Sequence, residues 1–152
     1  MSYTCEAVEQ PTQPVLSIRT RTPVQSLQVV LGKGFQDIVK LLNELGECPS
    51  GAPFVAYYNM DMQDLDIEIG FPVSRKLLGK EAVQSSEIPG GKHATCLYTG
   101  PYPEMPPAYE ALTSWVQENG YETTGMVYEH YLNNPGEVSP QELKTLIVFP
   151  LK

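Results

Sequence analysis

The chain repeats its own pattern of apolar runs, prolines and glycines. At an offset of 78 residues, the matching positions are Pro11 and Pro89, Pro23 and Pro101, Ile69 and Ile147, and Phe71-Pro72 and Phe149-Pro150. A further match, Tyr58 with Tyr131, has an offset of 73. This smaller offset is expected if the second helix is shorter by about one turn and the second hairpin loop, which comes after Tyr131, is longer by the same amount. Such self-similarity is typical of a duplicated structural module. We predict one domain over residues 1–152, with one module at about 1–76 and the other at about 79–152.

Each module is predicted to contain the order strand, helix, strand, strand. Apolar residues recur every three or four positions at 23–46 and 103–119, which indicates two amphipathic helices. Gly32 and Gly34 lie inside the first helix and predict a kink or the close approach of another element. The predicted strands are 3–8, 15–19, 53–58, 65–71, 81–88, 93–98, 125–132 and 143–151.

These elements predict an α+β fold, with a pseudo-twofold duplication of a β-α-β-β module and antiparallel strands. A module of about 75 residues buries a sheet poorly on its own, so we expect the two modules to pair. Paired modules would leave a central ligand groove along the pseudo-twofold axis.

Composition and charge exclude several classes of function. Ten basic against eighteen acidic residues give a net charge of −8, which argues against direct binding of nucleic acid. The three cysteines, Cys5, Cys48 and Cys96, indicate neither a disulfide scaffold nor a zinc site, and Cys96 is expected to be an inert core thiol. No signal peptide or membrane-spanning run is evident, so we expect a cytoplasmic protein without membrane contact.

Two acidic residues on predicted strands are candidates for a site. Glu129 lies between Val127 and Tyr131 on one strand face, where it either points to solvent or is buried with a cationic, hydrated or hydrogen-bonding partner. Glu68 alternates out of phase with its apolar neighbours Ile67 and Ile69, so we expect it on the surface. If that face of the strand instead lines the groove, Glu68 would be a second acid in the ligand pocket.

Nine tyrosines against four phenylalanines suggest that aromatic hydroxyls have a purpose. Aromatic faces would suit a flat or cationic organic ligand, whereas the alternative is that many of these rings simply fill a core. The two histidines, His93 and His130, have no metal-ligand spacing, so we expect no metal and no cofactor. The candidate ligand-binding residues are Phe54, Tyr57, Tyr58, Tyr102, Tyr109, Trp115, Glu129 and Tyr131; Trp115, at helical spacing with Leu112, also suits a core position.

Four segments resemble the GyrI-like small-molecule-binding domain, which is also the effector-binding part of multidrug-sensing transcription regulators and is related to the SOUL haem-binding fold. The first consists of Tyr57-Tyr58 and the strand residues 67–73 that follow, and the second is 98–102, just before the second helix. The third is 129–135 (Glu-His-Tyr-Leu-Asn-Asn-Pro), and the fourth is 147–151 (Ile-Val-Phe-Pro-Leu). The resemblance covers nearly the whole chain. It implies paired βαββ modules, a ligand groove between them, and a pocket acid at Glu129 rather than a solvent-facing one.

The resemblance also implies a choice of functions. The first is binding of hydrophobic, often cationic or aromatic compounds, with Glu129 as counter-charge. The alternative is a hydrolase of cyclopropane-containing toxins in which Glu129 is the general base and Tyr131 assists. The third is inhibition of DNA gyrase, and a regulator or gyrase would then be the protein partner. Leu146 stands where many relatives carry an acid, which argues against a role that requires a second acid at that position. No DNA-binding segment is evident, so we expect a stand-alone form.

Overall fold

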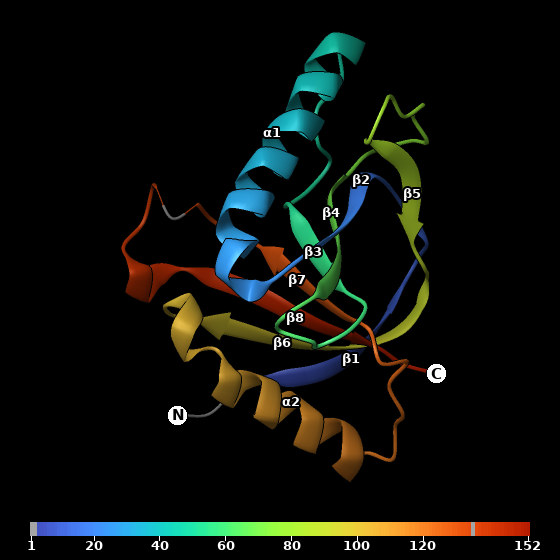
Figure 1. Cartoon of the computed structure of the whole chain (residues 1–152). Coiled ribbons are helices and arrows are strands. Elements are labelled where there is room, and N and C mark those ends of the chain that lie inside the picture. Colours follow the sequence, from blue (N-terminus) through green and yellow to red (C-terminus); the bar gives the residue numbers. More distant parts are fainter. Residues whose placement is uncertain (1–2, 135) are drawn as a thin grey trace. The chain divides into compact units, whose positions relative to one another are not determined.

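The computed structural model describes residues 3–134 and 136–152. Its helices and strands form two compact units. Figure 1 draws the chain in colours that run from blue at the N-terminus to red at the C-terminus. Unit 2 comprises residues 11–90, and unit 1 comprises residues 91–152 together with the strand from the first ten residues.

Unit 2 contains four antiparallel strands in the spatial order β3-β4-β2-β5. They are β2 (Gln13–Thr22), β3 (Phe54–Tyr57), β4 (Leu65–Pro72) and β5 (Gln84–Ile88). A single 3-10 turn, Val24–Ser26, leads into the helix α1 (Leu27–Leu45), which contacts β4 and β2. The helix ends at Gly46, whose φ of 69° is a left-handed conformation that glycine adopts without strain.

The core of unit 2 lies between α1 and one face of its sheet. Ile38 and Leu42 of α1 and Ile67 and Ile69 of β4 are almost fully buried. The predicted close approach inside α1 is confirmed at Gly34, where an added Cβ would lie 2.8 Å from Ile69 Cδ1. Helix and sheet are therefore in contact at this point with no room for a side chain.

Unit 1 contains four antiparallel strands in the order β1-β6-β8-β7. They are β1 (Cys5–Gln10), β6 (Gly91–Thr99), β7 (Val127–Tyr131) and β8 (Lys144–Pro150). The 3-10 turn Tyr102–Glu104 precedes the helix α2 (Pro106–Glu118), which contacts β6 and β1. A further 3-10 turn, Pro140–Glu142, precedes β8.

The predicted α+β class, with antiparallel strands and two helices, is confirmed, and both units repeat the order strand, helix, strand, strand. The strands at 13–22 and 65–72 in unit 2 correspond to those at 91–99 and 144–150 in unit 1 at the offset of 78. The unit bounds differ from the predicted modules, because β1 pairs with β6 and β5 pairs with β2. The strand β1 belongs to the first sequence repeat but pairs in unit 1, and β5 belongs to the second repeat but pairs in unit 2.

One residue match within the repeat was wrong. Tyr57 pairs with Ile67, and Tyr131 pairs with Thr145, which is 78 residues beyond Ile67. The strand register therefore makes Tyr57, rather than Tyr58, the equivalent of Tyr131, at an offset of 74. Hydrogen-bond register fixes which residues are equivalent, whereas the sequence match rested on residue identity alone.

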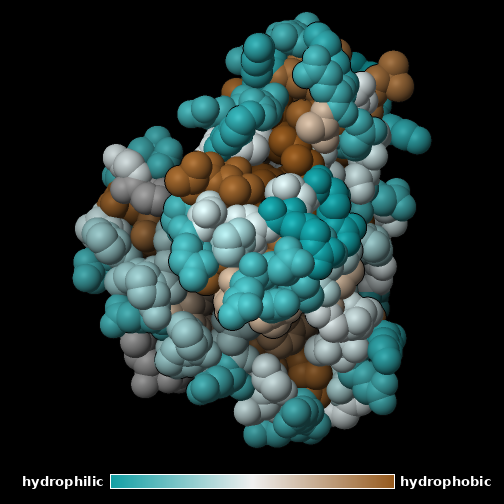
Figure 2. Space-filling view, viewed as in Figure 1, coloured by the Kyte–Doolittle hydropathy of each residue, from teal (hydrophilic) through white to brown (hydrophobic). Residues whose placement is uncertain are grey.

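Polar side chains dominate the visible surface, but α1 also exposes Val29, Val39 and Leu45. Figure 2 shows brown side chains among teal ones over this helix. Within the described residues, neither helix is long and apolar enough to cross a membrane.

Candidate functional site

Glu129 lies on the side of the unit 1 sheet that faces α2. It stands opposite Ile147 of β8, which is fully buried. Because side chains alternate along a strand, Tyr131 shares this side with Glu129, while His130 points to the other. Glu129 is partly buried, so the carboxylate is not the solvent-facing group that strand alternation alone had allowed.

Two tyrosine hydroxyls hold the Glu129 carboxylate. The Oη of Tyr131 donates to Oε1 at 2.9 Å, and the Oη of Tyr109, from the first half of α2, donates to Oε2. Hydrogen bonds to an ionised acceptor are stronger than neutral ones, and here each oxygen receives one. The pair of bonds links the helix and the strand through one carboxylate.

Further aromatic rings surround these hydroxyls. The ring of Tyr102, in the 3-10 turn before α2, packs edge-on against Tyr131 with centroids 5.8 Å apart. The ring of Tyr109 packs against Phe149 of β8 at 6.0 Å. Phe149 was not a predicted site residue, although its alternation with Ile147 along β8 places it on the same side of the sheet as Glu129.

Burial dominates the electrostatics of this cluster. Burial raises the pKa of Glu129 above its ordinary value, and the two tyrosine hydrogen bonds oppose that rise. Burial and, to a lesser extent, the charge of Glu129 raise the pKa of Tyr102. Among the ion pairs between described residues, none includes Glu129. The carboxylate is therefore desolvated, and no cationic side chain of residues 3–134 and 136–152 forms an ion pair with it.

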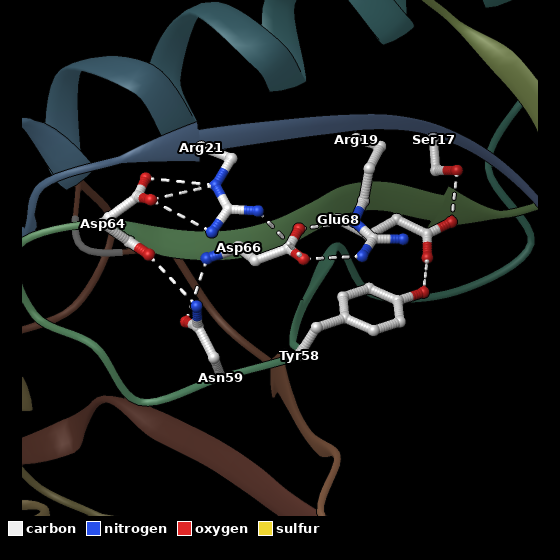
Figure 3. A network of polar contacts seen from close by, with 8 residues as sticks. All are labelled: Ser17, Arg19, Arg21, Tyr58, Asn59, Asp64, Asp66 and Glu68. Carbon is white, nitrogen blue, oxygen red and sulfur yellow. Dashed lines mark hydrogen bonds and ion pairs between the residues drawn. The ribbon is translucent and has the colours of Figure 1, made fainter.

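A second carboxylate, Glu68 of unit 2, is also buried, with 7% of its surface exposed, so the expectation of a surface position was wrong. Figure 3 shows Glu68 between two hydroxyls: Ser17 Oγ donates to Oε2 and Tyr58 Oη donates to Oε1, both at 2.5 Å. These two donors compensate for lost water, which is how a carboxylate is tolerated at this depth. Neither Ser17 nor the pairing of Tyr58 with Glu68 was predicted.

Charged residues extend this second cluster. The Arg19 guanidinium lies over the Tyr58 ring, with Cζ 3.5 Å from the centroid, and donates two hydrogen bonds to Asp66 at 2.6 and 2.8 Å. Arg21 forms ion pairs with Asp64 and Asp66 (Figure 3). The Arg19 side chain thus already supplies a cation to the Tyr58 face.

The remaining predicted site residues lie elsewhere in their units. Phe54 and Tyr57 are buried on β3 of unit 2. Trp115, near the end of α2, stacks on Tyr121 with centroids 5.9 Å apart. No group of three or more histidine, cysteine or acidic side chains suited to a metal ion occurs in residues 3–134 and 136–152.

The family model for the GyrI-like small-molecule-binding domain matches residues 3–152. The chain belongs to the GyrI-like family. No match is found among curated proteins.

Solved structures share the GyrI-like fold. The C-terminal domain of EcmrR is 23% identical with a TM-score of 0.76, covering all of this chain and 99% of that domain. EcmrR in its complex with DNA gives 24% identity and a TM-score of 0.85 over 99% of this chain, which spans 57% of the EcmrR chain.

Two further structures of this fold are a protein with a bound organic cation and a hydrolase. SAV2435, solved bound to tetraphenylphosphonium, is 11% identical with a TM-score of 0.66, over all of this chain and 94% of that one. A hydrolase from Listeria innocua is 13% identical with a TM-score of 0.69, over 97% of this chain and 91% of that one. At these identities, the likeness establishes the fold of this GyrI-like domain.

Proposed function

We propose that this GyrI-like domain binds hydrophobic organic cations, with Glu129 as the counter-charge. The observation that carries the proposal is the desolvated Glu129 carboxylate, which receives two tyrosine hydroxyls and forms no ion pair among the described residues. A desolvated charge without a counter-ion is unfavourable, so a bound cation would gain an attraction that no ion pair within the described part of the chain supplies.

The aromatic rings support a hydrophobic rather than a hydrated cation. Tyr102, Tyr109 and Tyr131 bring ring surface to the carboxylate, and ring faces attract organic cations. SAV2435 binds tetraphenylphosphonium, a cation of this kind, on a similar fold. Phe54, Tyr57, Tyr58 and Trp115 stay predicted ligand contacts from the sequence.

The test is isothermal titration calorimetry with a matched pair of ligands. Methyltriphenylphosphonium carries a positive charge, and triphenylphosphine oxide is a neutral compound of nearly the same shape. We expect Glu129→Gln to weaken binding of the cation at least about tenfold and to leave binding of the oxide nearly unchanged. Glu110→Gln, at an exposed acid on the same helix as Tyr109, is the control. Equal losses for both ligands would refute the role of Glu129 as counter-charge.

A second candidate function is hydrolysis of strained electrophiles, with Glu129 as general base. Burial raises the pKa of Glu129 towards the range in which a carboxylate accepts protons effectively. Each carboxylate oxygen already accepts one tyrosine hydroxyl and keeps a second lone pair that could accept a hydrogen bond from water. The same two hydrogen bonds lower the pKa of Glu129 and so weaken it as a base, which is why we rank hydrolysis behind binding.

Turnover of cyclopropane and epoxide substrates, followed by mass spectrometry, tests the second candidate. We expect product to form faster with the wild type than with Glu129→Gln if Glu129 is the base. Equal rates for the two proteins would exclude this mechanism.

A further inference from the structure

Two of the three cysteines lie face to face in unit 1. Cys5 of β1 is directly opposite Cys96 of β6 in the antiparallel register. Opposed residues in such a ladder have Cα atoms about 4.5 to 5.5 Å apart, which is within the range of about 4.4 to 6.8 Å that a disulfide spans. A bond between the two sulfurs would therefore require no change in strand pairing.

The surroundings keep the two thiols together. Two residues before β1, the ring of Tyr3 lies 6.4 Å from that of Tyr98 in β6, and this contact holds the chain that enters β1 against β6. The strand β1 also contacts α2, and Figure 1 shows it beside that helix. The thiol pair therefore belongs to a packed part of the unit.

The two thiols differ in access. Cys96 is fully buried, whereas Cys5 keeps part of its surface exposed. Burial, and then the contact with Cys5, raise the pKa of Cys96 to about 12, so Cys96 remains a protonated thiol. An oxidant in solution would consequently meet Cys5 first.

We infer that Cys5 and Cys96 form a site of oxidative modification, at which a hydroperoxide converts the facing thiols into a cross-strand disulfide. In the first step, the Cys5 sulfur attacks the peroxide, the O–O bond breaks, and Cys5 becomes a sulfenic acid with release of water or alcohol. In the second step, Cys96 Sγ attacks the Cys5 sulfur, the S–O bond breaks, and the hydroxyl leaves with the Cys96 proton as water. The peroxide is reduced by two electrons, and the two thiols supply them.

The second step is expected to be the slower one. A thiolate is the effective nucleophile, and Cys96 is held as a thiol. The sulfenic acid at Cys5 should accumulate long enough to be trapped by dimedone. This inference is independent of ligand binding at Glu129, since it concerns only the thiols of β1 and β6.

The test is peptide mass spectrometry of the Cys48→Ser protein after treatment with hydrogen peroxide. Cys48 is exposed and is replaced to avoid bonds between molecules. We expect a loss of two hydrogen atoms, a linked peptide pair containing Cys5 and Cys96, and recovery of both thiols with dithiothreitol. Irreversible oxidation of Cys5 with no linked peptide, or no reaction under conditions that oxidise free cysteine, would overturn the inference.

Two variants in the Cys48→Ser background assign the steps. Cys96→Ala should leave a Cys5 sulfenic acid that dimedone traps, without a linked peptide. Cys5→Ser should leave Cys96 unmodified, because the remaining thiol is fully buried. Dimedone labelling of Cys96 in the Cys5→Ser variant would contradict the proposed order of steps.

Discussion

The two buried carboxylates show how single residues are tolerated away from water. Glu129 and Glu68 each receive two hydroxyl donors, so the oxygens that lose water gain hydrogen bonds. The two carboxylates differ in their charged neighbours. Arg19, whose side chain covers the Tyr58 ring, adds positive charge near Glu68. No cation is among the groups that shift the pKa of Glu129. This difference makes Glu129 the residue at which a bound cation would have the larger effect.

Glu129 should leave a signature in the pH dependence of stability. Because its pKa is raised in the folded state, the folded protein binds the proton more tightly than the unfolded chain. The stabilisation from the protonated form is complete below the ordinary value of 4.5 and is lost as the pH rises through the folded-state pKa. We expect the unfolding free energy of the wild type, relative to Glu129→Gln, to fall as the pH rises from 4.5 towards neutrality, measured by urea denaturation.

The exposed Glu110 gives the matched control for that experiment. Glu110→Gln should follow the wild type across the same range. A difference between the wild type and Glu129→Gln that is constant with pH would show that burial does not perturb Glu129.

Particular residues bring the helices against the strands of their units. Tyr109 connects α2 to β7 through Glu129, and Gly34 brings α1 against Ile69 of β4. Alternation along β4 correctly predicts that the Glu68 side chain lies on the face of the sheet that points away from α1. Its burial could not be predicted, because exposure depends on side chains from other elements, here Ser17 of β2 and Tyr58.

Tyr109→Phe removes one hydroxyl from this helix contact. A hydrogen bond to a charged acceptor contributes about 1.5–3 kcal/mol, so we expect a comparable loss of unfolding free energy in the wild type. The loss should be smaller in the Glu129→Gln background, where the acceptor is neutral, and a double-mutant cycle by urea denaturation measures the difference. Tyr121→Phe, which removes a hydroxyl with no hydrogen bond among the described residues, is the control. Additive effects of the Tyr109 and Glu129 changes would contradict the coupling.

The two glycines of α1 offer a paired experiment on helix packing. An added Cβ at Gly32 meets nothing within 4 Å, whereas at Gly34 it meets Ile69. Gly32→Ala should stabilise the protein by up to about 1 kcal/mol through helix propensity alone. Gly34→Ala gains the same helix propensity but overpacks against Ile69, which costs about 1–3 kcal/mol, so we expect it to be less stable than Gly32→Ala. Thermal or urea denaturation of both variants measures these changes in stability. Equal stabilisation by both substitutions would contradict the contact between Gly34 and Ile69.

Across the whole molecule, the repeat predicted from sequence accounts for the element order but not for the chemistry. By strand register, Val55 is the unit 2 equivalent of Glu129, and Leu146 is the unit 1 equivalent of Glu68. Each acid therefore has an aliphatic counterpart, and the two halves have different polar groups on the same scaffold. The exchange of β1 and β5 between the repeats could not be predicted, because strand pairing between distant segments leaves no local pattern. The opposition of Cys5 and Cys96 was hidden for the same reason.

Acid should destabilise the molecule through His130. Burial, with a smaller effect of His93, lowers the pKa of His130 from 6.5 to about 4. The folded state holds His130 neutral, so its contribution to stability is present above pH 6.5 and is lost as the pH falls towards 4. This change is opposite in sign to that of Glu129. NMR titration of the two histidines should show His130 titrating well below 6.5, and an ordinary value would contradict the lowered pKa.

The most direct test of Glu129 as counter-charge is the number of protons released when a cation binds. A permanent cation beside a carboxylate lowers the carboxyl pKa, so binding to the partly protonated wild type should release protons. Calorimetric titration with methyltriphenylphosphonium, in buffers of different protonation enthalpy at mildly acidic pH, measures that number. We expect proton release from the wild type and none from Glu129→Gln. Equal proton release from both proteins, or none from either, would contradict it.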